Sequence, residues 1–397
     1  MTTRFGVLAR LAVCSAVCAL ALGACSSGGS SDKSSPTTVG AAAAAQAYVE
    51  PGPYPVGITT LQIPSGAQVE VWYPATDDAT GRQDTYDVRA LIPDVVKALL
   101  TGDAQATFTI DAGRDATVAS GRFPLVLFSH GASGIRQQSS FLTAHLASWG
   151  MIVAAPDHWS RDLYHSLGRT LGEQYPTAPD PVDDFRATRA LLERENTASS
   201  SRFAGHVDTA QVGAVGHSAG GGTVLGFAPD EGVKGYVSLA SGRLTGGGPS
   251  TTATVAPAPL PDKPSLFMAG GGDQVVPVAT TEAAFGDAPA PSRLWVIGSA
   301  GHLAFADFCT FGNGKGIIGV AESAGLGGFL DAAPQFRRLG EDGCLPPNVP
   351  VTETFPPVKH AVTAFLRELF GVDPAPVGLG PAVAGQYAVP VTIDEKL

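Results

Sequence analysis

Short β-like runs of apolar residues alternate with helical patterns along most of this 397-residue chain. This alternation limits the possible folds more than any other feature of the sequence. Consecutive parallel strands need a crossover between them, usually a helix, so the alternation predicts the α/β class, with a mostly parallel central sheet flanked by helices. The expected strands are Pro124–Phe128, Met151–Ala155, Gln211–Val215, Gly235–Ala240, Ser265–Ala269 and Arg293–Ile297, and the expected helices are Gln137–Trp149, Asp183–Glu195, Ser218–Ala228, Thr280–Phe285 and Val358–Phe370.

Two further β-like runs precede these strands and helices in the chain. Gly57–Ile63 and Gln68–Tyr73 alternate apolar and polar residues, which predicts a hairpin at an edge of the sheet. The polar stretch Pro74–Arg122 follows, with one helix-like patch at Val88–Leu100. Arg243–Pro264 is rich in Gly, Thr and Pro and is too short and too polar to form a cap domain. We therefore expect no separate cap domain on the sheet.

The composition agrees with one large folded domain. Apolar residues make up 44% of the chain and charged residues only 15%, which excludes wholesale disorder and a coiled coil. The formal net charge is −11 and no basic run occurs, so a phosphate backbone would repel the chain and no nucleic acid is expected as a partner. Residues 48–373 are enough for a single α/β domain.

The N-terminal residues 1–24 are typical of a secretion signal. Two arginines supply positive charge, and Leu11–Leu22 is an apolar run too short to span a bilayer core. The residues before Cys25 fit a bacterial lipobox, in which the cysteine is lipidated after cleavage; the alternative is an ordinary signal peptide with an incidental cysteine. Residues 25–47 then form a Ser/Gly/Ala-rich tether. We expect the protein at the outer face of the cytoplasmic membrane, held there by the lipid anchor only.

Two cysteines remain beyond the lipidation site, Cys309 and Cys344. In an oxidising compartment an even number favours pairing, and a disulfide closing a loop of about 35 residues would stabilise the fold by about 3 to 4 kcal/mol; two free thiols are the alternative. Both lie in the long excursion 303–357, which we expect to lie near the active site. The Pro-rich tail 374–397 has one β-like patch, Tyr387–Ile393, and is either a disordered end or a strand added to a neighbouring sheet.

The motif most informative about chemistry is Gly216–Gly220, GHSAG, which fits the G-x-S-x-G pattern of a nucleophile elbow. The bare pattern is weak in a Gly- and Ser-rich chain, but here a buried strand leads into it and a helical pattern leaves it. The glycines have a physical reason, because side chains at those positions would clash with neighbouring backbone in the strained turn. The motif predicts Ser218 as a nucleophile, whereas the alternative is a glycine turn without chemistry.

A nucleophilic serine needs a base and an acid, which follow it in the order acid, then histidine, in this architecture. Of the two histidines after Ser218, His360 falls inside the last helical pattern, whereas His302 follows a strand and is the expected base. Asp273 is the expected acid, because it alone directly follows a buried strand. The other acidic residues in the interval lie in helices or polar loops: Asp230, Glu231, Asp262, Glu282 and Asp287.

The oxyanion of the transition state needs two hydrogen-bond donors. The elbow predicts the backbone N–H of Ala219, and the loop after the first core strand predicts the N–H of Ala132. His130 in that loop is expected to shape the turn, and His158 and His217 are expected to be structural. The sequence contains no H-E-x-x-H, C-x-x-C or G-x-x-x-x-G-K pattern, so neither a metal nor a cofactor is expected.

These motifs together resemble the platelet-activating-factor acetylhydrolase and dienelactone-hydrolase-like group of α/β-hydrolases, which includes the polyester hydrolases related to cutinase. The segment Leu125–His158, the elbow and the segment Pro264–His302 carry the resemblance, which covers about Val56–Gly371. It implies the α/β-hydrolase fold and ester hydrolysis.

Three departures limit what the resemblance implies about the substrate. The acetylhydrolases place their acid just after the strand that follows the elbow, where this chain has Ser238–Ser241, so Asp273 matches the later position of the polyester hydrolases. The aromatic residues that flank the polyester hydrolase cleft are absent, with Ala132 at one place and Gly242–Leu244 at the other. Dienelactone hydrolases use cysteine where this chain has Ser218. None of the named substrates therefore follows.

The sequence thus predicts an extracytoplasmic serine hydrolase of carboxylic esters acting through an acyl-enzyme. Its substrate would be a small-molecule, lipid or polymer ester, and the excursion 303–357 is expected to roof the cleft. Two alternatives stay open. One is a lipase-like or peptidase-like hydrolase, because the triad does not choose between ester and amide. The other is a catalytically idle, lipid-anchored binding protein on the same fold. The sequence does not indicate the oligomeric state.

Overall fold

A computed structural model describes residues 43–100, 106–243, 259–332 and 334–397. The predicted signal, the lipidation site Cys25 and most of the predicted tether lie outside these ranges. The chain divides into two units, residues 1–37 and 38–397. All that follows concerns the second unit.

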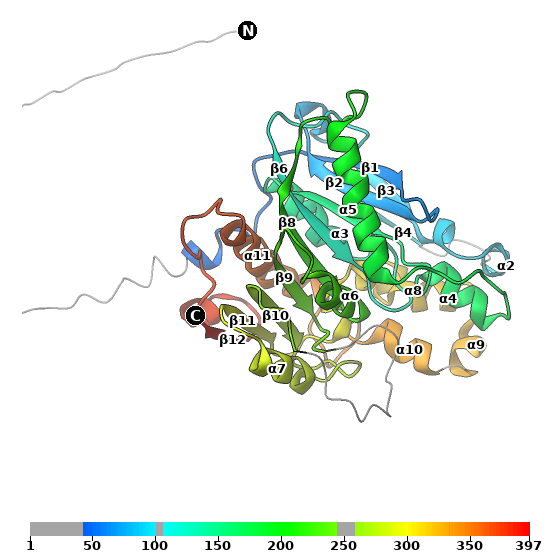
Figure 1. The fold of residues 1–397 in the computed structure, drawn as a ribbon. Helices are drawn as coiled ribbons and strands as arrows, with labels where there is room; N and C mark the ends of the chain where they lie inside the picture. The colour runs from blue at the N-terminus through cyan, green and yellow to red at the C-terminus, as the bar shows by residue number, and fades with distance from the viewer. Residues whose placement is uncertain (1–42, 101–105, 244–258, 333) are drawn as a thin grey trace, which may run out of the picture. The chain divides into compact units, whose positions relative to one another are not determined.

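Ten strands of the described residues form one sheet, in the order β12-β11-β10-β9-β8-β6-β7-β2-β1-β5 (Figure 1). The pairs from β7 to β11 are parallel, whereas β2 pairs antiparallel with β7 and with β1. The predicted α/β class with a mostly parallel sheet is therefore confirmed. The strands are β1 Val56–Gln62, β2 Gln68–Pro74, β5 Gly113–Arg114, β6 Phe123–Ser129, β7 Ile152–Pro156, β8 Val207–His217, β9 Val233–Leu239, β10 Ser265–Gly270, β11 Ser292–Ile297 and β12 Val391–Lys396; β3 Asp84–Asp87 and β4 Thr107–Ile110 form a separate pair.

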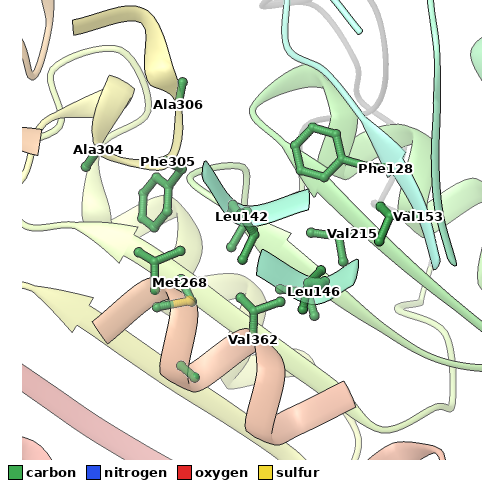
Figure 2. Close-up of a cluster of buried hydrophobic side chains, with 14 of the residues drawn as sticks. Phe128, Leu142, Leu146, Val153, Val215, Met268, Ala304, Phe305, Ala306 and Val362 are labelled. Carbon is green, nitrogen blue, oxygen red and sulfur yellow. The ribbon is translucent and has the colours of Figure 1, made fainter. Parts of the chain in front are cut away.

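The continuous apolar strands are buried on both faces, as expected for a parallel sheet covered by helices. Within β6, Leu125 and Leu127 belong to one core cluster, and Val126 and Phe128 belong to the other. The cluster that includes Phe128 also holds side chains of α3 (Ser140–Ser148) and α11 (Val351–Leu369), as Figure 2 shows. The opposite cluster holds side chains of α5 (Pro181–Thr197), α6 (Ala219–Phe227) and α7 (Val278–Asp287).

Five short helices lie outside the strand–helix alternation. The patch Val88–Leu100 forms a 3₁₀ turn and then α2 (Asp94–Lys97). Sequence analysis did not predict four of the five, because each is only six to eight residues long. They are α4 (Leu163–Thr170) and the three helices inside the excursion, α8 (Gly316–Ser323), α9 (Gly327–Ala332) and α10 (Pro334–Glu341). The last helix, α11, begins at Val351, seven residues before the predicted start. It continues through Pro356 and Pro357.

The C-terminal residues are part of the sheet. β12 pairs antiparallel with β11 of the same chain, which decides between the two alternatives for this tail. The ammonium of Lys396 donates hydrogen bonds to the carbonyls of Phe285, Gly286 and Ala288 at the end of α7. At the other end of the unit, Ala45 is fully buried, and the hydroxyl of Tyr387 donates to its carbonyl oxygen at 3.2 Å. The end of the predicted tether therefore packs against the C-terminal segment.

Candidate active site

Ser218 stands between β8 and α6 in a strained backbone conformation. Its φ of 54° and ψ of −123° lie outside the regions that residues with a side chain normally adopt. Its backbone N–H donates to the carbonyl of Leu239 at the end of β9, at 2.8 Å. The strand and the helix thus hold this turn at the carboxyl edge of the sheet, which is the geometry expected of a nucleophile elbow.

Two glycines of the motif make room for this turn. A Cβ on Gly216 would overlap the carbonyl group of Gly220, and a Cβ on Gly220 would overlap the carbonyl group of Ser129. Both neighbours are backbone atoms, which cannot move aside as a flexible side chain can. The close approach of three backbone segments therefore requires glycine at both positions.

The structure brings together the three side chains that the sequence selects as nucleophile, base and acid. Nε2 of His302 lies 2.9 Å from Oγ of Ser218, and Nδ1 lies 2.8 Å from Oδ2 of Asp273. Asp273 follows β10 and His302 follows β11, two adjacent parallel strands. The other carboxylate oxygen of Asp273 accepts hydrogen bonds from the N–H groups of Val275 and Val276, at 2.8 and 2.7 Å. The carboxylate is therefore fixed on both sides.

A further carboxyl group, which sequence reasoning missed, ties the two loops together. Oδ2 of Asp342 accepts from the N–H of Gln274 at 2.7 Å, and its backbone carbonyl accepts from the N–H of Leu303 at 2.8 Å. Burial raises the pKa of Asp342 above its ordinary value. Because Gln274 and Leu303 directly follow Asp273 and His302, Asp342 sets the distance between the acid and base loops.

A second connection runs from the elbow to the loop that precedes α3. The amide of Gln138 accepts from the N–H of Gly131 at 3.0 Å and lies 2.8 Å from Nδ1 of His217. Nε2 of His217 lies 3.0 Å from the carbonyl of His302. Burial lowers the pKa of His217 well below its ordinary value, so its ring is neutral and links Gln138 to the base loop. Sequence analysis predicted a structural role for His217 but not this partner.

The predicted oxyanion loop lies beside the serine. Gly131, Ala132 and Ser133 line the same cavity as Ser218, and a Cβ on Gly131 would lie 3.2 Å from Cβ of Ser218. Ala219, the other predicted donor, is the first residue of α6. Both backbone segments that the sequence predicts around the oxyanion are therefore next to the nucleophile.

Behind this loop lies a second Ser–His–Asp chain that is fully buried. Oγ of Ser129 lies 2.9 Å from Nε2 of His158, whose Nδ1 lies 2.9 Å from Oδ2 of Asp184. Arg161 donates to Oγ of Ser129 at 2.6 Å and to the carbonyl of His130 at 3.1 Å. Ser129 and His158 are 0% exposed, so this buried chain of hydrogen bonds supports the loop that follows β6.

His130 shapes the same turn. Its Nδ1 lies 2.8 Å from the carbonyl of Gly131, and its Nε2 accepts from the N–H of His158 at 3.1 Å. Burial lowers the pKa of His130 to about 3, so the ring is neutral. The remaining candidate base, His360, is buried in α11, where it accepts a hydrogen bond from the N–H of Tyr48 at 3.3 Å.

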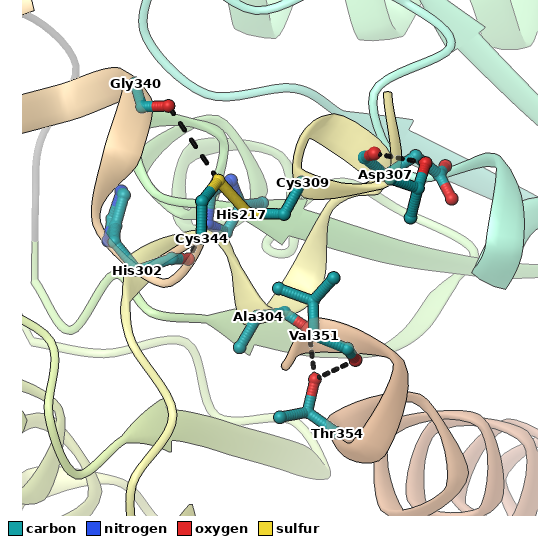
Figure 3. The surroundings of a disulfide bond; sticks show 10 residues. His217, His302, Ala304, Asp307, Cys309, Gly340, Cys344, Val351 and Thr354 are labelled. Atoms are coloured by element: carbon teal, nitrogen blue, oxygen red, sulfur yellow. Dashed lines mark hydrogen bonds between the residues drawn. A yellow bond between two sulfur atoms is a disulfide. The ribbon is translucent and has the colours of Figure 1, made fainter. Parts of the chain in front are cut away.

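The predicted disulfide between Cys309 and Cys344 is present and lies next to the base loop (Figure 3). Cys309 follows the 3₁₀ turn His302–Phe305, and Cys344 comes two residues after Asp342. The disulfide therefore closes most of the excursion immediately beside His302.

An apolar cavity of about 300 Å³ opens over Ser218 and His302. Three wall segments surround it: residues 88–100, residues 163–171, and residues 317–340 of the excursion. The excursion thus lines one side of the cleft, and α2 and α4 supply two further sides that the sequence did not predict.

Within the described ranges, no group of three or more His, Cys, Asp or Glu side chains is placed to hold a metal ion. Among the helices of the same residues, none has both the length and the apolar character needed to cross a membrane.

Comparisons with known proteins agree with this architecture. Residues 52–174 match the family described as platelet-activating factor acetylhydrolase, isoform II. Among solved structures, ferulic acid esterase from Streptomyces cinnamoneus is similar, at 22% sequence identity and a TM-score of 0.58, over 88% of this chain and 99% of that chain. No curated protein matches the chain. The matched segment is thus similar to the platelet-activating factor acetylhydrolases, and the similar solved structure shows that the chain has the fold of that esterase.

Proposed function

We propose that this protein is a serine hydrolase of carboxylic esters. The observation that carries the proposal is the position of His302, whose two ring nitrogens lie within hydrogen-bond distance of Ser218 and Asp273. The family matched by residues 52–174 is named for an acetylhydrolase, and the similar solved structure is an esterase. Both names favour an ester over an amide as the substrate.

The mechanism uses the three side chains in the order of their hydrogen bonds. Oγ of Ser218 attacks the ester carbonyl while Nε2 of His302 takes its proton, and Asp273 orients the ring and stabilises the imidazolium. The N–H groups of Ala132 and Ala219 donate to the oxyanion. His302 then gives the proton to the departing alcohol oxygen. Water, deprotonated by the same nitrogen, releases the acid from Ser218.

The first test is hydrolysis of p-nitrophenyl esters by the wild type and by Ser218→Ala. We expect turnover by the wild type and a loss of about 10⁴-fold or more in the variant, because the nucleophile is gone. A serine-reactive phosphonate should label the wild type and Ser129→Ala, but not Ser218→Ala. Turnover that is equal in wild type and Ser218→Ala would refute the assignment.

A p-nitroanilide of the same acyl group tests the peptidase-like alternative, which requires cleavage of the anilide by the wild type and its loss in Ser218→Ala. A wild type that neither labels nor turns over would instead support the binding protein.

We further propose that the protein is exported and anchored through a lipid on Cys25. The disulfide between Cys309 and Cys344 supports an oxidising compartment. Metabolic labelling with a radioactive fatty acid should mark the wild type and leave Cys25→Ala unlabelled. Equal labelling of both would exclude lipidation at this cysteine.

A further inference from the structure

The cavity over the nucleophile is built almost wholly from aliphatic and aromatic side chains. In α4 and its C-terminal cap, Leu163, Leu167 and Leu171 are spaced four residues apart and all line the cavity, as expected for one face of a helix. Ile318 and Leu339 of the excursion contribute to another wall. A polar ligand would lose its hydration in such a cavity without gaining hydrogen bonds.

The cavity also offers little to a charged group. Among the described residues that line it, the one charged side chain is Arg89. The guanidinium of Arg89 donates to both carboxylate oxygens of Asp87, at 2.8 to 3.1 Å. A neutral, apolar part of the substrate therefore fits this space better than an ionic head group.

The apolar surface continues out of the cavity onto its rim. Leu99, Leu171 and Phe329 each line the cavity, yet are 50%, 44% and 42% exposed. They come one from each wall segment, and α2, α4 and α9 lie on the same side of the sheet core in Figure 1. Of the eight exposed large apolar side chains in the described residues, five belong to the wall segments: Val95, Leu99, Tyr164, Leu171 and Phe329.

We propose that the substrate is an ester with a long alkyl chain, which the cavity holds and the rim continues to contact. This inference rests on the proposed ester hydrolysis by Ser218. A cavity of about 300 Å³ has room for several methylene groups, since the share of liquid volume of one water molecule is about 30 Å³. An acetyl group would leave most of this space empty.

The test is a series of p-nitrophenyl esters from acetate to tetradecanoate, each kept below its micelle-forming concentration. We expect kcat/KM to rise by up to about fourfold for each methylene that enters the cavity and to level off once the cavity is filled. Alkyl phosphonates of the same lengths should label Ser218 at rates that follow the same order. A kcat/KM that is highest for the acetate ester and falls with each added methylene would overturn the inference about the alkyl chain. In that case, turnover of the acetate ester that depends on Ser218 would still support the proposed ester hydrolysis.

Variants of the walls give a second measurement. Leu167→Trp fills the cavity and should lower the decanoate-to-acetate ratio of kcat/KM by at least about tenfold, and Leu339→Phe offers a smaller filling change if the first variant folds poorly. Phe329→Ala on the rim should lower the ratio less. Val372→Ala is the control, because Val372 is 50% exposed and does not line the cavity. An unchanged ratio in both folded wall variants would show that the alkyl chain binds elsewhere.

Discussion

At Ser218 the backbone adopts a conformation that costs a residue with a side chain about 1 to 3 kcal/mol. The surrounding contacts offset this cost. The turn is continuous with β8 on one side and α6 on the other, and the carbonyl of Leu239 accepts a hydrogen bond from the N–H of Ser218. The strained turn therefore depends on the close approach of neighbouring backbone, which Gly216 and Gly220 permit.

Alanine at either glycine should disrupt both the fold and the site. We expect Gly216→Ala and Gly220→Ala to lower esterase activity by at least about 100-fold, because a displacement of about 1 Å at the nucleophile has that effect. Thermal unfolding should show a loss of about 1 to 3 kcal/mol or more from overpacking.

The control for this pair is Gly286→Ala in α7. A Cβ at Gly286 meets no atom within 4 Å and the residue does not have a positive φ. This variant should be more stable than wild type by about 0.5 to 1 kcal/mol, because glycine is unfavourable inside a helix. Elbow variants that behave like Gly286→Ala would mean that the turn tolerates a side chain.

At the residue level, chain order and strand ends were enough to select Ser218, Asp273 and His302, which the structure places in one hydrogen-bonded chain. Their catalytic roles remain the proposal made above. Gln138 and Asp342 escaped prediction because their importance lies in the partners they meet across the fold. Neither belongs to a motif, and no local pattern distinguishes them from surface polar residues.

Among the elements, the disulfide-closed excursion does two things: one part of it lines the cavity, and another part contacts the loops of the triad residues. Its helices line the cavity. The segment after α10 carries Asp342 to the loops that contain Asp273 and His302. The sequence predicted the position of the excursion near the site. Its three helices were not predicted, because each is shorter than about three turns and is held by tertiary contacts.

Removal of the disulfide should therefore affect stability and catalysis together. We expect the double variant Cys309→Ser, Cys344→Ser to lose about 3 to 4 kcal/mol of unfolding free energy, measured by urea unfolding. Its ratio of decanoate to acetate turnover should also change, because the wall formed by residues 317–340 loses its closure.

A reducing agent separates this effect from other consequences of the substitutions. It should reproduce the same changes in the wild type and leave the double variant unaffected. Wild-type stability and selectivity that are both unchanged on reduction would contradict a role for the disulfide in holding the wall.

The whole molecule buries many histidines, and this determines how its stability responds to pH. Burial lowers the pKa of five of them in the folded state. The unfolded chain takes up protons on these rings below about pH 6.5 whereas the folded chain does not, so stability is lost as the pH falls from about 6.5 toward 4. The five are His130, His145, His158, His217 and His360.

Asp307 opposes this trend. It is buried in the 3₁₀ turn Asp307–Thr310, where its carboxylate accepts from the N–H of Phe141 in the first turn of α3 at 3.1 Å. Burial raises its pKa to about 7. The contribution of Asp307 is present below about pH 4 and is lost as the pH rises through 7. Each such group changes the unfolding free energy by at most about 1.4 kcal/mol per pH unit.

Urea unfolding between pH 4.5 and 7.5 tests the balance. Burial also raises the pKa of three other carboxyl groups, Asp162, Asp184 and Asp342. We expect wild-type stability to fall on acidification, because the five histidines outnumber these four carboxyl groups, and we expect a steeper fall in Asp307→Asn. The exposed Asp94 provides the control variant Asp94→Asn, which should follow the wild type. A stability that rises on acidification across this range would contradict the assignment of neutral buried histidines.

The contact between Tyr387 and Ala45 also has a consequence for handling the enzyme. In Figure 1, residues 43–50 and β12 lie on the side of the sheet away from α2, α4 and α9, which carry the rim of the cavity. Attachment of the domain to a solid support through either of these ends leaves the entrance open to dissolved substrate. Random coupling through lysines would instead include Lys97, an exposed residue of α2 two positions before Leu99, and would immobilise part of the enzyme with its cavity toward the support.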